Sequence, residues 1–163
     1  MKRRLLLGVI AGGVVGSIVG VEAWAAGPRG PRVEVSVIHA TKAPGGTSVD
    51  PQLRDLPQLT KQEPFIRYNV FRLLDRQTLT FDKGKTASCA LVDGRTLQVT
   101  LVDGSDDKSK KDERYHLRAE IAGVTKKEFL KLLEVTAGAD EPFFVGGQSY
   151  KSGTLFLELV IRA

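Results

Sequence analysis

The chain has 163 residues, a formal net charge of +5 and one cysteine, Cys89. This length suits one domain with its own hydrophobic core. A single cysteine excludes an internal disulfide, so apolar burial must supply the stability. Basic and acidic residues are interspersed along the chain, a pattern that favours solubility over polyanion binding, and we expect no nucleic-acid partner.

Residues 1–25 have the features of a secretory signal peptide. Three basic residues precede the uncharged stretch 5–21, and residues 23–25, Ala-Trp-Ala, form a small-x-small cleavage site. We expect cleavage after Ala25 and export to the periplasm or cell envelope. Cleavage removes three basic residues and one acidic residue, so the net charge falls to about +3.

The alternative interpretation of this segment is a retained inner-membrane anchor. Residues 5–21 number 17, the lower limit for a membrane span. Four glycines recur at every fourth position, a spacing that allows membrane helices to pack closely; they are Gly8, Gly12, Gly16 and Gly20. Membrane contact is expected only if this segment is not cleaved.

Alternating apolar and polar residues predict most of the strands that follow. Residues 26–31 contain two prolines and two glycines and are predicted to be a flexible leader, which leaves 32–163 as a single domain. Clear two-residue periodicity occurs at residues 33–40, 96–102, 115–121 and 155–161. In the longest β-like run, 65–81, the apolar residues change from even to odd positions. This change predicts a bulge near residues 70–72 or burial on both faces.

Turn signals separate these runs. Asp93-Gly94 predicts a hairpin between 86–92 and 96–102. Residues 82–85 predict another hairpin turn, and residues 148–153 predict a turn after a strand that ends at Gly146-Gly147.

A helix is predicted in one further segment and is one of two alternatives in another. Asp50-Pro51 is typical of a helix start, with Leu53, Leu56 and Leu59 as a buried stripe over one or two turns. Residues 125–135 fit both a helix and a strand. We assign the second half to a strand, and the first half stays open.

These elements together predict an all-β fold. Seven to nine short strands, with turn signals at intervals of about 8–12 residues and one short helix, are typical of an antiparallel β-sandwich or barrel-like domain. In this interpretation the domain follows the N-terminal signal helix. The connections are short, so antiparallel pairing should dominate.

Residues that bind metals do not form a pattern in this sequence. A zinc site needs three or four converging ligands, whereas His39, Cys89 and His116 lie far apart in the chain. A calcium loop counted from Asp103 has lysine where glycine belongs and Arg114 where the bidentate glutamate belongs. We therefore predict no metal site and no cofactor.

The nucleophile candidates also lack their partners. Cys89 shares the parity of its apolar neighbours and is predicted to be a small buried thiol. Residues 147–151 resemble a nucleophile elbow, but Lys151 occupies the position of the second glycine. We therefore predict no catalytic residue.

Two stretches together resemble small, uncharacterised exported β-proteins of myxobacterial type. The likeness covers about two thirds of the chain and rests on residues 68–74, Leu79, Gly84, 93–99, 143–147 and 153–155. It implies an exported β-domain and supplies no catalytic residue. Residues 133–147 are also similar to a strand-turn-strand of the outer-membrane secretin family, which implies an envelope location.

Export, the β-pattern and the absence of a catalytic pattern favour a non-catalytic protein-interaction or accessory module of an envelope complex. Phe156 and Val160, on the otherwise polar face of the last strand, are the candidate contacts, since strand-edge pairing is a common binding mode of such folds. The alternative is that another element covers both side chains.

Two other functions compete with this one. A glycan- or small-ligand-binding module would need an exposed aromatic residue, and Tyr150 is the candidate. A hydrolase would need a facing pair of carboxylates, which no motif in the sequence nominates.

Overall fold

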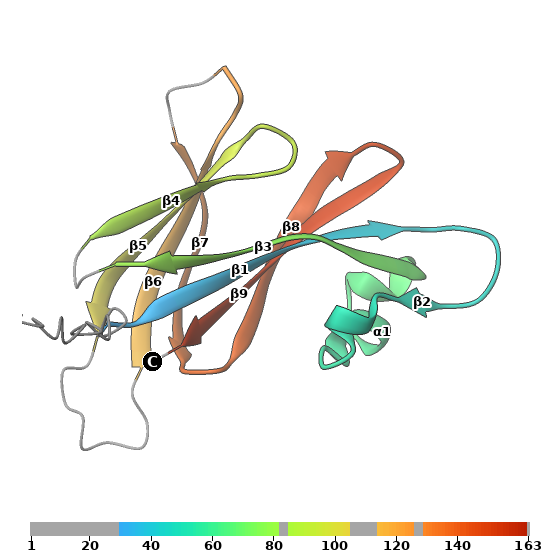
Figure 1. Ribbon diagram of the computed structural model, residues 1–163, viewed down its shortest axis with the longest axis horizontal. Helices are drawn as coiled ribbons and strands as arrows, with labels where there is room; N and C mark the ends of the chain where they lie inside the picture. Colours follow the sequence, from blue (N-terminus) through green and yellow to red (C-terminus); the bar gives the residue numbers. More distant parts are fainter. Residues whose placement is uncertain (1–29, 82–84, 105–113, 126–128, 163) are drawn as a thin grey trace, which may run out of the picture.

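The computed structural model describes residues 30–81, 85–104, 114–125 and 129–162 (Figure 1). These residues form nine strands in two separate sheets, in which all pairings but one are antiparallel. The predicted all-β, sandwich-like fold is therefore confirmed. The proposed signal segment, 1–25, lies outside the described residues.

The five-stranded sheet has the order β2-β3-β1-β9-β8, and the four-stranded sheet has the order β4-β5-β6-β7. The first contains β1 (Arg32–Thr41), β2 (Ser48–Val49), β3 (Val70–Thr80), β8 (Pro142–Tyr150) and β9 (Gly153–Arg162). The second contains β4 (Thr86–Ala90), β5 (Thr96–Gly104), β6 (Arg114–Ala122) and β7 (Phe129–Gly138). Between β2 and β3 lies a helical segment made of η1 (Pro51–Leu53), α1 (Gln58–Lys61) and η2 (Phe65–Arg67).

The main core lies between the two sheets. Alternate residues point into it over 33–37 of β1, 97–101 of β5, 115–121 of β6 and 155–161 of β9, as the two-residue periodicity predicted. Most of these side chains are aliphatic, and they include Val33, Leu97, Leu117 and Leu159. Each such side chain contributes about 2 kcal/mol through removal from water, so this layer supplies much of the stability.

An outer core lies on the opposite face of the five-stranded sheet, beneath the helical segment. Its buried residues are Ile38, Ala40, Leu53, Leu59, Phe65, Phe71 and Phe156. The Asp50 side chain caps η1 by accepting a hydrogen bond from the Gln52 amide at 3.0 Å. Leu53 and Leu59 are fully buried, as predicted, whereas Leu56 is only partly buried. Figure 1 shows the helical segment beside the end of this sheet that is remote from the four-stranded sheet.

One bulge allows β3 to contribute to both cores. Leu74 is an extra residue opposite the junction between Val37 and Ile38 of β1. Phe71 therefore contacts the outer core, whereas Leu79 lies in the main core, although the two residues have the same parity. The predicted bulge exists, but it lies further along β3 than expected.

Residues 65–67 form a 3₁₀ turn and not the start of a strand. Within this turn Ile66 is 52% exposed, while Phe65 is buried. The reason is tertiary, because Phe65 reaches the outer core only if the chain turns before β3 begins.

One predicted strand end and one predicted hairpin turn are wrong. β8 does not end at Gly146-Gly147 but continues to Tyr150, with a bulge between Gly146 and Gln148, and Lys151 then begins the turn with φ 48°. Residues 82–85 do not join a hairpin, because β3 pairs with β1 and β4 pairs with β5. Residues 82–84 themselves lie outside the described part.

One predicted hairpin is confirmed, and one open assignment is resolved. The Asp93-Gly94 hairpin between β4 and β5 is confirmed, and Gly94 has the left-handed φ of 83° that the turn requires. The segment that fitted both a helix and a strand is a strand from Phe129 onward. Pairing with β6 overrides its helical periodicity; residues 126–128 are not described.

Candidate functional site

A pocket of about 280 Å³ opens where the helical segment meets β8 and β9. We call it the aromatic pocket, because four of its eight lining residues carry aromatic rings. The helical segment and the residue after it supply Pro64, Phe65, Arg67 and Tyr68; β8 supplies Phe144, Gly146 and Gly147; and β9 supplies Phe156. It lies on the outer face of the five-stranded sheet, next to the outer core.

The four rings hold one another in edge-to-face contacts. The centroid of Phe65 lies 4.9 Å from that of Phe144 and 4.8 Å from that of Phe156. Tyr68 meets Phe156 at 5.6 Å with an interplanar angle of 76°. Such pairs are worth about 0.5–1.5 kcal/mol each beyond their burial, so the rings are fixed before any ligand arrives.

Gly146 explains how Phe156 fits against β8. A Cβ atom added at Gly146 would lie 1.9 Å from Cδ1 of Phe156, so only glycine permits this approach. Gly147 follows in the bulge with φ 99°, a left-handed conformation that also favours glycine. Both glycines are exposed, so bare backbone of β8 forms one side of the pocket.

Polar groups occur at two places around the pocket. The Tyr68 hydroxyl shares a 2.9 Å hydrogen bond with Oγ1 of Thr154, which fixes the ring from behind. At the rim, the Arg67 side chain is 73% exposed and donates from Nε to Oε2 of Glu63 at 3.2 Å. The pocket is therefore apolar inside, with one cationic group at its edge.

Two of the predicted contact residues are buried. Phe156 and Val160 are only 3% and 4% exposed. They belong to a run of seven buried residues in β9, which has strands on both sides and both faces covered. Neither is an exposed contact as predicted, and the alternative that other elements cover them holds. Phe156 nevertheless lines the aromatic pocket.

Tyr150 lies elsewhere. It is half-buried against the main core, and its ring meets His39 edge-to-face at 5.4 Å. The Nζ atom of Lys151 lies 5.2 Å from the ring centroid, and the Tyr150 carbonyl is 3.2 Å from Nε2 of His39. The three predicted contacts therefore do not form one surface, because Tyr150 and Phe156 serve different faces of the sheet.

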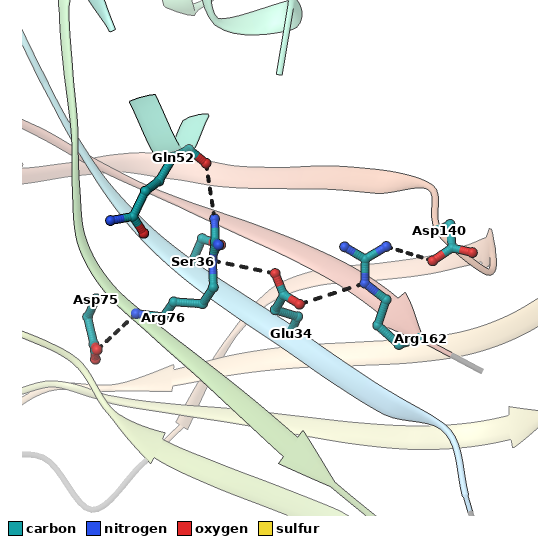
Figure 2. Close-up of polar contacts among 7 residues, drawn as sticks. All are labelled: Glu34, Ser36, Gln52, Asp75, Arg76, Asp140 and Arg162. Carbon is teal, nitrogen blue, oxygen red and sulfur yellow. Dashed lines mark hydrogen bonds and ion pairs between the residues drawn. The ribbon is translucent and has the colours of Figure 1, made fainter. Parts of the chain in front are cut away.

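A row of ion pairs crosses the outer face of the five-stranded sheet, further along its strands from the aromatic pocket (Figure 2). Glu34 lies between two guanidinium groups, with Arg76 Nε at 3.4 Å and Arg162 Nε at 3.7 Å. Arg76 also donates to Ser36 Oγ at 3.2 Å and to the Gln52 carbonyl at 3.4 Å. This last bond ties the helical segment to the sheet.

One carboxyl group beside this row of ion pairs is buried. Glu158 is 5% exposed, and burial raises its pKa although the Ser36 hydroxyl and Arg76 act in the opposite direction. Glu34 adds to the rise through its charge. Glu34 and Glu158 thus lie on the same sheet face. Glu34 is held in ion pairs there, and neither residue lines the aromatic pocket.

The other candidate chemical groups lie apart. His39, Cys89 and His116 belong to β1, β4 and β6. Cys89 is buried, as predicted, and this burial, with a smaller contribution from Asp75, raises the pKa of its thiol to about 11. Among the described residues, no three or more His, Cys, Asp or Glu side chains are grouped to hold a metal ion.

Comparison with known proteins gives no family assignment: no protein-family model, curated protein or solved structure matches the chain. No helix in the described ranges has the length and hydropathy needed to cross a membrane. The aromatic pocket was missed in the sequence. Its one available signal was the Gly-Gly pair inside β8, since glycine within a strand marks a close approach of another group.

Proposed function

We propose that this protein is an exported, non-catalytic β-domain that binds a protein partner in the cell envelope. In this proposal the aromatic pocket receives an apolar side chain of the partner. The observation that carries it is the pocket itself, where preformed aromatic walls surround a site open to solvent. Partner binding concentrates at such apolar pockets, into which a single anchor side chain inserts.

The size of the pocket favours a side chain over a free small molecule. Its volume of about 280 Å³ lies just below the range of roughly 300–1,000 Å³ that is usual for ligand sites. The lining also offers few side-chain hydrogen-bonding groups, Arg67 and Tyr68, and the Tyr68 hydroxyl is already bonded to Thr154. A glycan would require more such groups, so glycan or small-ligand binding is the second proposal.

The export part of the proposal rests on the sequence of residues 1–25. It predicts a mature N-terminus near Ala26 in protein recovered from the envelope fraction. Mass spectrometry of that N-terminus tests this prediction. An intact Met1 would contradict cleavage and favour a domain anchored in the membrane.

Photo-crosslinking in intact cells tests the binding surface. A photo-reactive phenylalanine analogue replaces Arg67 at the rim, and the control carries it at Arg54, an exposed residue of the same helical segment that does not line the pocket. We expect a specific envelope protein on position 67 and none on position 54. Equal labelling at both positions, or none at either, would contradict a partner at this pocket.

A further inference from the structure

We infer that the partner binds as an extended segment, which adds a strand to the free edge of β8 and inserts one apolar side chain into the aromatic pocket. An acidic residue of that segment pairs with Arg67. This inference rests on the proposed function and specifies the chemistry of the partner.

The first observation is the position of β8 in its sheet. β8 is the last strand in the order β2-β3-β1-β9-β8 and, within the described ranges, pairs only with β9. Its other edge therefore presents a row of backbone N–H and C=O groups. An extended chain satisfies such a row, which is why free edges are used for strand addition.

The second observation is that this edge is bare beside the pocket. Gly146 and Gly147 carry no side chains, are exposed, and line the pocket at the same time. Neighbouring strands lie about 4.8 Å apart, so an added strand would run directly beside the pocket opening. A side chain on its outer face then reaches the rings of Phe65 and Phe144.

The third observation is charge. Arg67 stands at the rim with 73% of its side chain exposed. Glu63 engages Nε of Arg67, but an exposed ion pair of this kind is weak and exchanges readily. Since side chains alternate along a strand, an acidic residue two positions from the apolar one lies on the same face and meets Arg67.

The test uses synthetic peptides and the chain as processed by the cell. The probe is a nine-residue blocked peptide of threonine and serine with a central phenylalanine and an aspartate two positions before it. Three variants replace the phenylalanine by alanine, replace the aspartate by lysine, or carry N-methyl groups on alternate backbone nitrogens. Binding is followed by NMR at millimolar peptide, and hydrogen exchange reports on the amides of β8.

We expect the probe to protect β8 amides. The alanine and N-methyl variants should bind at least tenfold more weakly, because the first loses the anchor and the second loses the strand hydrogen bonds. The lysine variant should bind about fivefold more weakly to the native chain, and Arg67→Glu should reverse that preference. This reversal separates a direct charge contact from a general loss of folding.

Two results would overturn the inference. Equal binding of the probe and its N-methyl variant would mean that the side chain is recognised without strand addition. No binding of any peptide, combined with a specific crosslink at position 67, would remove the extended-segment mode and leave the proposed function standing. If the crosslink at position 67 is also absent, both the extended-segment inference and the proposed function are contradicted.

Discussion

The two cores of this domain are built differently. The main core is mostly aliphatic and is assembled from alternating residues of long strands in both sheets. The outer core joins three short helical turns to one face of the five-stranded sheet, and aromatic rings meet there. The first is a continuous layer, whereas the second ends in an open pocket. The regular packing of the main core closes the space between the sheets, and the irregular packing of the outer core leaves a pocket open to solvent.

Truncation of one buried leucine to alanine in each core should show this difference between the two cores most strongly. Leu97 and Leu59 are both 0% exposed, one in each core. Leu97→Ala is expected to reduce the free energy of unfolding by about 2–5 kcal/mol. Leu59→Ala should cost less globally, because it releases the helical segment without opening the sandwich.

Urea denaturation gives the global values, and hydrogen exchange gives the local ones. We expect faster exchange of amides 51–68 in Leu59→Ala, with the main-core strands unchanged. Equal global losses without local loosening would mean that the two cores form one cooperative unit.

A methyl group at Gly146 should disturb the outer core next most strongly. Because its Cβ atom would lie 1.9 Å from Phe156, Gly146→Ala is expected to cost about 1–3 kcal/mol through overpacking. Gly46→Ala is the matched control, since nothing lies within 4 Å of a Cβ atom there. Thermal denaturation compares the two, and equal melting temperatures would refute the close packing of Phe156 on β8.

The hydroxyl bond behind the pocket should contribute less. Tyr68→Phe removes the 2.9 Å bond to Thr154 and is expected to cost about 1 kcal/mol. Thr154→Val removes the same bond from the other side. A double-mutant cycle should therefore give less than the sum of the two single losses. Strict additivity would show that the bond does not form in solution.

Carboxyl groups on the outer faces of the two sheets should change the stability of the protein with pH in opposite directions. On the five-stranded sheet, burial raises the pKa of Glu158 above its unfolded value. Its stabilising contribution is therefore full below the unfolded pKa and is lost as pH rises through the folded one. Glu158→Gln should raise the melting temperature relative to the native chain only at a pH high enough for this contribution of Glu158 to be lost.

Glu134 on the four-stranded sheet is the matched control. A hydrogen bond from Lys131, aided by the charges of Lys131 and Arg118, lowers its pKa. Its contribution is present above the unfolded pKa and is lost as pH falls. Glu134→Gln should therefore lower the melting temperature at neutral pH and have little effect in acid. Melting curves from pH 3 to 8 measure both, and shifts of the same sign would contradict these assignments.

Sequence reasoning succeeded where neighbouring residues determine the outcome. The alternation in residues 115–121 and the Asp93-Gly94 turn were correctly interpreted, since parity and positive φ are local properties. It failed at β8, where the Gly-Gly pair looked like a strand end. These glycines make room for Phe156 of β9, a partner that no local pattern identifies.

The sequence by itself determined the β-character of this domain, the helix cap at Asp50 and the buried state of Cys89, because each follows from residue type and spacing along the chain. Only the tertiary structure decided that β3 and β4 belong to different sheets and that Phe156 is covered. It also brought Phe65, Phe144 and Phe156 together around one pocket. The physical reason is that strand order and the position of the helical segment depend on contacts between residues far apart in the chain.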